Sequence, residues 1–255
     1  MKIAVLVKEV PDLEARVTVV GGGKALDVEK KRCLNFFDEI AVEGALRLKA
    51  ANPGSTVYAV AAGAQVGVDA ARRALAMGAD AVFHIDDPAL ADADPLTVAE
   101  ALAALVRREG FDVVLAGRQA TDDEAGLVGP LVAQLLSIPC VAGITSLSVE
   151  SGSALATRET DEGSQTVRVA LPALFSAEKG LYEPRVPQVM GLMKAMRTPV
   201  PKVSLATLGV TPRPPLAPSS FRGPTPRPKT RFIEGDPEAA AATLVRLLKE
   251  EAKVL

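Results

Sequence analysis

The sequence predicts an α/β protein: a doubly wound, mostly parallel sheet with an antiparallel extension at one edge, and an extended C-terminal arm that ends in a helix. Three observations support this prediction. Short apolar runs alternate with stretches of helical periodicity through the first half of the chain. Strand-like segments follow one another between residues 144 and 176 without helices between them. Ten of the 19 prolines then fall between Pro199 and Pro237, where neither a regular helix nor a central strand is expected.

Four apolar runs rich in valine and isoleucine are predicted to be buried strands. They are residues 2–8, 56–62, 81–85 and 112–116. Because these runs are almost continuously apolar, they are typical of parallel strands that helices cover on both faces. Ligands bind beyond the carboxyl ends of the strands in such sheets, so we expect a binding site there.

Three segments between these strands are predicted to be helices. Residues 38–50 place apolar side chains at helical spacing on one face. Residues 68–80 show a similar pattern, which stops at Gly78, a good C-terminal cap. Residues 94–110 begin with an aspartate cap followed by proline and end at a glycine.

The segment at residues 16–28 interrupts this alternation of strands and helices. Its apolar and polar residues alternate on both sides of three glycines, which predicts a β-hairpin. The letters GGGK within it resemble part of a phosphate-binding loop. That loop needs Ser or Thr after the lysine, whereas Ala25 follows Lys24 here, so we favour a plain hairpin turn.

Strand-like segments make up the third quarter of the chain. They are residues 144–150, 153–160 and 165–176, and the letters TDEGS at 160–164 predict a turn between the last two. We expect these segments to form an antiparallel unit attached to the edge of the first sheet.

The last quarter is predicted to be a second unit, residues 199–255, beside a first unit of residues 1–198. From Pro184 to Ile233 there is no Asp or Glu but there are nine Lys or Arg, so the arm is expected to be basic and extended. A helix follows, with Asp236 as its cap, proline at its first position and one apolar stripe. This stripe must be buried, either by folding back or by packing on another subunit.

Composition argues against several classes of protein. The net charge of −2 does not favour nucleic-acid binding, and the cations of the arm are better assigned to a protein partner. Cys33 and Cys140 are the only cysteines and form no CxxC pattern, which argues against a disulfide framework or a zinc site. The N-terminal apolar run is too short for a signal peptide, and no stretch approaches the roughly 18 apolar residues of a membrane helix. We therefore expect a cytoplasmic protein without membrane insertion.

The fourth predicted strand runs directly into the loop AGRQATDDEAGLVGP, residues 116–130. A loop that leads into a helix presents free backbone N–H groups and the positive end of the helix dipole, which suits an anion such as phosphate. The glycines of the loop allow its backbone to approach a ligand closely. The carboxylates of Asp122, Asp123 and Glu124 would accept hydrogen bonds from ribose hydroxyls or an adenine amine. Two alternatives remain open: the aspartates cap a helix, or the three acids hold magnesium.

Other side chains have both a functional and a structural interpretation. Asn35 and Asp38 stand at a predicted helix start, where they would act as caps. The adjacent Phe36 and Phe37 either face a ring system or pack in the core. His84, the only histidine, lies in an apolar run and is expected to be a core residue, so no nucleophile–histidine pair can be assembled.

Residues 176–199 combine charges, prolines and clustered apolar side chains, among them three of the five methionines. Flexible, methionine-rich surfaces suit adaptable partner binding. A short core helix with methionines as filler is the alternative.

Six stretches, taken together and in order, resemble the β (small) subunit of the electron-transfer flavoproteins. They are VLVKEVPD (5–12), NFFDEIAVEGALRLK (35–49), RRALAMGADAVFHI (72–85), DVVLAGRQATDDEAGLVGP (112–130), TRETDEG (157–163) and LPALFSAEKGLYEPRVPQVMGLMKA (171–195). The resemblance covers residues 1 to about 200. ALAMGAD and EPR…MKA, on either side of the acidic loop, are its most specific parts, whereas the proline-rich tail matches weakly.

The resemblance implies a sheet of the adenine-nucleotide-binding type and a role as an electron carrier. Members of the family pair with a larger α subunit that holds FAD. The heterodimer takes electrons from acyl-CoA and other dehydrogenases and passes them to a membrane quinone oxidoreductase. The β subunit performs no bond-making chemistry, and in most members it buries an AMP. The arm and terminal helix would clasp the α subunit.

The resemblance also implies site residues by motif. The AMP pocket would involve Leu6, Asn35, Phe36, Phe37, Asp38, Ala62, Gly117, Arg118, Gln119, Ala120, Thr121, Asp122, Asp123, Glu124, Ala125, Gly126, Leu127 and Val128. Leu13 and Phe37 would approach the flavin of the partner from this side. A recognition segment, residues 178–194, would bind dehydrogenases through Glu183, Pro184, Arg185, Val189, Met190 and Lys194, with Val189 docked in their pocket.

Two departures from the family pattern bear on these expectations. Leu127 and Val128 stand where many members carry an amide and a hydroxyl, so backbone N–H groups would have to bind the phosphate. Leu13 replaces an aromatic residue that some members place beside the flavin. A bifurcating subgroup binds a second FAD instead of AMP, usually with a loop like STDGDTAQVGP, and the loop of this chain is closer to the AMP type. An ATP-using enzyme of a related fold is a third hypothesis, opposed by the missing Walker loop.

Overall fold

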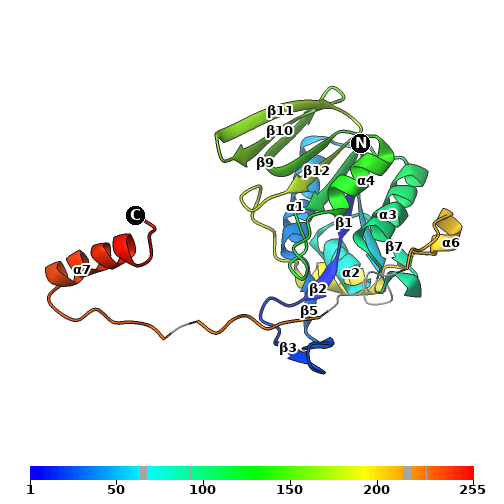
Figure 1. Ribbon diagram of the computed structural model, residues 1–255. Helices are drawn as coiled ribbons and strands as arrows, with labels where there is room; N and C mark the ends of the chain where they lie inside the picture. The colour runs from blue at the N-terminus through cyan, green and yellow to red at the C-terminus, as the bar shows by residue number, and fades with distance from the viewer. Residues whose placement is uncertain (64–67, 92, 215–219, 228) are drawn as a thin grey trace.

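A computed structural model describes residues 1–255 except 64–67, 92, 215–219 and 228. Its main feature is a nine-stranded sheet in the order β11-β10-β9-β12-β8-β1-β6-β7-β13, shown in Figure 1. The seven strands β9-β12-β8-β1-β6-β7-β13 are parallel to one another, and β10 is antiparallel to both β9 and β11. These strands are β1 (Lys2–Val7), β6 (Thr56–Gly63), β7 (Ala81–Asp86), β8 (Val113–Gly117), β9 (Cys140–Glu150), β10 (Ser153–Thr160), β11 (Gly163–Ala170), β12 (Ala173–Ala177) and β13 (Lys202–Val203). The predicted doubly wound, mostly parallel sheet is confirmed.

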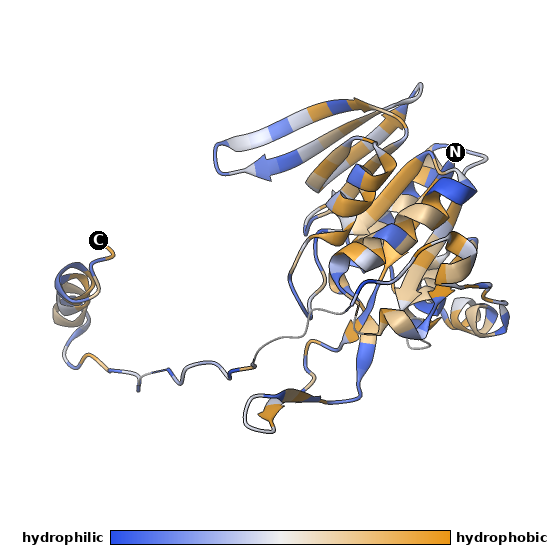
Figure 2. Cartoon of the chain, turned by 45° about the vertical axis from the view of Figure 1, so that its right-hand side comes forward, coloured by the Kyte–Doolittle hydropathy of each residue, from blue (hydrophilic) through white to orange (hydrophobic). Residues whose placement is uncertain are grey.

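Helices cover both faces of the parallel strands, and each face has its own apolar cluster. On one face lie α1 (Phe36–Ala51), α2 (Val68–Met77) and α5 (Val189–Arg197). On the other face lie α3 (Pro95–Glu109), α4 (Val128–Leu136), α6 (Leu205–Leu208) and the short 3-10 helix η2 (Pro88–Leu90). Figure 2 shows the most hydrophobic segments gathered in the central strands between these two layers. This burial explains why the central strands read as continuous apolar runs.

The helix ends follow the predicted caps in two cases. The Asp94 carboxylate accepts hydrogen bonds from the N–H groups of Leu96 and Thr97 at the start of α3, and Gly110 ends that helix in the left-handed conformation. Gly78 follows α2 with a φ of +127°. At the start of α1, however, Asn35 makes no side-chain cap hydrogen bond, so its interpretation as a cap is wrong.

The predicted strand at 165–176 is in fact two strands with different roles. β11 is the antiparallel outer strand, whereas β12 lies inside the sheet, parallel to both β8 and β9. Pro172 stands in the break, where its missing N–H cannot join a ladder. All residues of β12 are buried, because helices cover it on both sides. The antiparallel extension therefore consists of β9, β10 and β11 alone.

The hairpin predicted at 16–28 is confirmed as β3 (Val17–Val20) and β4 (Ala25–Val28). Its neighbour in the chain is a small antiparallel pair, β2 (Glu9–Pro11) and β5 (Arg32–Leu34). The backbone N–H of Phe221 in the C-terminal arm donates a 2.7 Å hydrogen bond to the carbonyl of Gly23 at the hairpin tip. The hairpin and the arm are thus held side by side.

The C-terminal arm leaves the sheet after α6. Before that point β13 pairs with β7, and Leu205 of α6 is buried. The terminal helix α7 (Pro237–Glu250) begins at Asp236, whose carboxylate caps it as predicted. None of its residues is buried, and Figure 1 shows it far from the sheet, so it does not fold back. Residues 215–219 and 228 of the predicted arm lie outside the described residues.

Among the described residues, no helix has the length and apolar character needed to cross a membrane.

Candidate functional site

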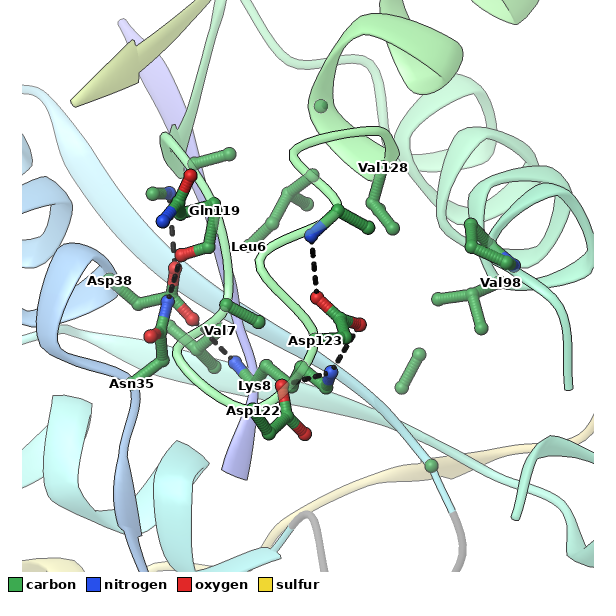
Figure 3. Close-up of a pocket in the computed structure, with 18 of the residues that line it drawn as sticks. Leu6, Val7, Lys8, Asn35, Asp38, Val98, Gln119, Asp122, Asp123 and Val128 are labelled. Carbon is green, nitrogen blue, oxygen red and sulfur yellow. Dashed lines mark hydrogen bonds and ion pairs between the residues drawn. The ribbon is translucent and has the colours of Figure 1, made fainter. Parts of the chain in front are cut away.

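A cavity of about 530 Å³ opens at the carboxyl ends of β1, β6 and β8, as expected for a parallel sheet (Figure 3). The acidic loop between β8 and α4 forms one wall, and the starts of α1 and α3 contribute others. Of the residues predicted for the pocket, those that line this cavity are Leu6, Asn35, Asp38, Ala62, Gly117, Arg118, Gln119, Ala120, Asp122, Asp123, Ala125, Gly126, Leu127 and Val128.

The remaining predicted pocket residues lie outside the lining. The rings of Phe36 and Phe37 contact each other edge to face at 5.3 Å, and Phe36 packs against the core. Thr121 contributes its backbone N–H to the Asn35 side chain, and Glu124 adopts a left-handed turn conformation with a φ of +49°. Leu13 is 70 % exposed.

Asn35 ties the start of α1 to the acidic loop. Its Nδ2 donates to the carbonyl of Gln119 at 2.8 Å, and its Oδ1 accepts from the N–H of Thr121 at 3.1 Å. The side chain is almost completely buried, so both hydrogen bonds are shielded from water. The amide therefore fixes the first half of the loop against α1 instead of capping the helix.

Asp38 joins three elements at the floor of the cavity. Its carboxylate accepts from the backbone N–H of Lys8 at 2.7 Å and from that of Gly117 at 3.0 Å. Burial raises the pKa of this carboxyl to about 7, although the hydrogen bonds from Asn35, Lys8 and Gly117 oppose the rise. Asp38 thus connects the ends of β1 and β8 through buried hydrogen bonds. Its carboxyl group changes charge near neutral pH.

Gly117 is needed for this contact, because α1 fills the space beside its Cα. A Cβ at this position would lie 2.3 Å from Oδ1 of Asp38 and 2.8 Å from Cβ of Phe37. Gly129, also expected to admit a ligand, packs against the sheet, where its Cβ would meet Leu174 and Ala116 at ordinary distances. Both glycines thus serve helix–strand packing, and because both also line the cavity, their predicted role in the close approach of a ligand stays a prediction.

Lys8 is a cavity residue that the sequence-based prediction of the site missed. Its Nζ lies 2.7 Å from Oδ1 of Asp122 and 3.0 Å from Oδ2 of Asp123, and Figure 3 shows the three side chains meeting at the cavity. Burial lowers the pKa of Lys8, but the two carboxylates outweigh that effect and raise it above its ordinary value. Its signals in the sequence were its place at the end of an apolar strand and within the stretch VLVKEVPD.

The two alternatives for the acidic loop do not fit this geometry. Asp123 accepts from the N–H of Ala125 within the loop, and α4 begins only at Val128, so neither aspartate caps that helix. Within the part of the chain that the structure describes, no group of three potential metal ligands is assembled. The lysine between the carboxylates occupies the position that a cation would need.

The start of α4 is open toward the cavity. Its N-cap, Leu127, offers no side-chain hydrogen bond, and the first N–H groups of a helix have no acceptor within it. Leu127, Val128 and Gly129 all line the cavity. These N–H groups and the helix dipole can bind an anion without help from a polar side chain.

The opposite wall of the cavity could not be foreseen from motifs, because apolar residues at ordinary helical spacing carry no signal of a ligand. In Figure 3, Val98 of α3 stands across the cavity from Val128. The lining residues that were missed are Val7, Lys8, Glu9, Arg32, Gly63, Leu90, Ala91, Ala93, Pro95, Val98, Leu102 and Ala116.

The recognition segment presents an apolar surface. Val189 is 72 % exposed and Met190 is 79 % exposed, and Ala195 alone is buried in α5. The interpretation of these methionines as core filler is therefore wrong. Glu183, Arg185 and Lys194 are exposed and Pro184 is half-buried. His84, by contrast, is fully buried in β7, as expected of a core residue.

Comparisons with known proteins agree with these features. Residues 24–208 match the family described as the electron transfer flavoprotein domain. Electron transfer flavoprotein subunit beta of Syntrophomonas wolfei is 35 % identical over 254 residues, which cover 100 % of this chain and 98 % of that protein. The subunit of the same name from Bacillus subtilis is 34 % identical over 260 residues and 100 % of both chains. That of Mycobacterium leprae is 37 % identical over 214 residues, or 82 % of this chain and 80 % of the relative. The chain therefore belongs to the β-subunit family of the electron transfer flavoproteins.

Proposed function

We propose that this chain binds AMP in the cavity and pairs with a larger α subunit that holds FAD. The heterodimer takes electrons from acyl-CoA and other dehydrogenases and delivers them to a quinone oxidoreductase. Family membership supports the electron-transfer role itself. The AMP, the partners and the direction of electron flow are our proposals.

The observation that carries the AMP proposal is a cavity that ends at the uncapped start of α4. A phosphate there would be bound by backbone N–H groups, as the apolar pair Leu127 and Val128 requires. The apolar wall that includes Leu6, Val98 and Leu102 suits a purine ring. The AMP is structural in this proposal, since it fills the space between the strand ends and the acidic loop.

The chain itself makes and breaks no bonds in this proposal. The FAD supplies the redox chemistry and is held by the α subunit. Leu13 is largely exposed, which leaves it free to contact a flavin-bearing partner. The part of the predicted unit 199–255 that follows α6 clasps this partner, because α7 carries leucines that nothing in the described part of the chain buries.

The recognition segment binds dehydrogenases in this proposal. Its exposed Val189 and Met190 form part of an apolar surface, and such surfaces on soluble proteins mark sites of protein association. Glu183, Pro184, Arg185 and Lys194 complete the proposed segment.

Co-expression with the larger subunit tests the proposed function. We expect a stable heterodimer that carries FAD and is reduced by an acyl-CoA dehydrogenase in the presence of its substrate. A chain that stays alone when the larger subunit is present would contradict the carrier proposal. ATP hydrolysis by the chain alone would favour the enzyme hypothesis instead.

A further inference from the structure

The recognition segment is held against the body of the protein by a buried carboxylate. Glu43 lies in the middle of α1, and its side chain is only 3 % exposed. Arg185 reaches it from the segment with two side-chain hydrogen bonds, Nε to Oε2 at 2.6 Å and Nη2 to Oε1 at 3.0 Å. A bidentate ion pair of this kind fixes the relative orientation of the two side chains as well as their distance.

A second arginine completes the cluster around this carboxylate. Arg47, one turn along α1, donates from Nε to Oε1 of Glu43 at 2.9 Å. Its guanidinium also lies 4.7 Å from the ring centre of Tyr182. Burial raises the pKa of Glu43, but the hydrogen bonds from Arg185 and Arg47 outweigh burial and lower it below the ordinary value. The carboxylate is therefore ionised, and both of its oxygens accept hydrogen bonds from arginine.

The chain around Arg185 packs tightly on α1 as well. Leu181 is 4 % exposed, and a Cβ at Gly44 would touch it at 3.5 Å. The segment thus packs on the surface of α1 from Leu181 to Arg185.

The far end of α5 has an anchor of its own. Arg72 of α2 donates to the carbonyl groups of Ala195, Met196 and Thr198. A Cβ at Gly191 would lie 2.6 Å from the carbonyl oxygen of Ala76, so α5 presses directly on the backbone of α2. Both ends of the helix are therefore fixed, while its outer side chains remain exposed.

We propose that Glu43 and Arg185 are positioning residues, which hold the apolar surface of α5 in its docking geometry before a dehydrogenase arrives. Arg185, predicted from its motif to contact the partner, acts instead through Glu43. Preorganisation of this kind lowers the entropy lost on association. This inference rests on the proposed function of the recognition segment. It adds the two residues that fix the position of the segment on the protein.

The test uses the assembled heterodimer with Glu43→Gln, which keeps the shape of the side chain and removes its charge. We expect amide hydrogen exchange at residues 181–189 to speed up at least tenfold and the KM for a purified acyl-CoA dehydrogenase to rise about tenfold. The kcat at saturating dehydrogenase and the FAD content should not change, because the flavin site is untouched. Unchanged exchange and unchanged KM would overturn the inference.

Glu39→Gln is the matched control. Glu39 lies on the same helix and pairs with Arg73 at 3.2 Å, and among the described residues no hydrogen bond or ion pair joins its side chain to the recognition segment. This variant should leave both exchange and KM as in the wild type. An effect equal to that of Glu43→Gln would overturn the inference in favour of a general loss of charge on α1.

A double-mutant cycle separates positioning from direct contact. If the two residues act as one unit, Glu43→Gln, Arg185→Met and the double variant have the same effect. If Arg185 contacts the partner, the double variant is worse than Glu43→Gln, and Arg185→Met raises KM without faster exchange. Either result would overturn the inference. If Glu43→Gln does not fold, the same exchange measurement on Arg185→Met tests the inference. The side chain of Arg185 is 47 % exposed, so its removal leaves the core intact.

Val189→Glu distinguishes failure of the inference from failure of the proposed function. If Val189→Glu leaves the KM unchanged, the segment does not bind dehydrogenases and the proposed function is wrong at this point. If Val189→Glu raises KM while Glu43→Gln changes neither readout, only the positioning inference is wrong.

Discussion

At the scale of single residues, the site is held together by pairs that lie far apart in the chain. Lys8 is 114 residues from Asp122, and Asn35 is 84 residues from Gln119. The motif resemblance pointed to Asn35, Asp38 and the aspartates, but not to what each of them bonds. A sequence pattern records local spacing, so it located Asn35 and Gln119 without indicating that they bond to each other, and it missed Lys8, which has an ordinary place after a strand.

Lys8 balances the negative charge of the acidic loop, so we expect the loss of its charge to weaken AMP binding. In Lys8→Met, the carboxylates of Asp122 and Asp123 are left uncompensated beside the proposed phosphate, and like charges repel. We expect AMP retention after gel filtration of the heterodimer to fall about tenfold.

A charge-neutral variant serves as the control for this effect. Lys8→Met combined with Asp122→Asn and Asp123→Asn removes the cation and both anions together, so AMP retention should recover. If retention stays low in the triple variant, Lys8 acts through something other than charge balance.

The raised pKa of Asp38 gives a prediction on pH. Its pKa in the folded protein is about 7, against an ordinary value of 3.8, so the folded state binds the proton more tightly than the unfolded state. The stability that this proton contributes is complete below about pH 4 and is lost as pH rises through 7. Across that window, wild type should lose at most about 4 kcal/mol relative to Asp38→Asn, at 1.36 kcal/mol per unit of pKa.

Thermal melts of both heterodimers between about pH 5 and pH 8 measure this loss. The difference between the melting temperatures of wild type and Asp38→Asn should shift against wild type as pH rises. A constant difference would show that Asp38 does not titrate in this range.

At the scale of elements, periodicity predicted the central strands and the helices between them, because burial on one or both faces leaves a repeating pattern. The break between β11 and β12 was not foreseen. β12 is a short, fully buried strand that follows an exposed one after only two residues, and its place between β8 and β9 depends on long-range pairing that local pattern does not encode. The same holds for β13, whose two residues are recognised as a strand only through their pairing with β7.

The exposed surface of α5 gives a prediction at this scale. Val189→Glu places a charge at a side chain that we propose to dock in an apolar pocket, where an unpaired charge is costly to bury. We expect the KM for the dehydrogenase to rise at least tenfold with unchanged FAD content, as measured by steady-state reduction of the heterodimer. The residue is 72 % exposed in this chain, so folding should not be affected.

At the scale of the whole molecule, the arm and α7 extend away from the sheet, as Figure 1 shows, which is an unstable arrangement for an amphipathic helix on its own. Sequence predicted the helix and its cap, and left open whether its apolar stripe folds back or meets another subunit. The structure excludes folding back for the described residues, and the proposed α subunit is what the stripe would meet. Composition contained no information about this choice, because both solutions bury the same leucines.

The most direct test of the central claim is the nucleotide content of the purified heterodimer after heat release. We expect one FAD and one AMP per heterodimer, with the AMP lost when Lys8 is replaced by Met and regained in the triple variant. Two flavins without AMP would assign the cavity to a second FAD. A heterodimer that releases FAD and no further adenine nucleotide would contradict the account.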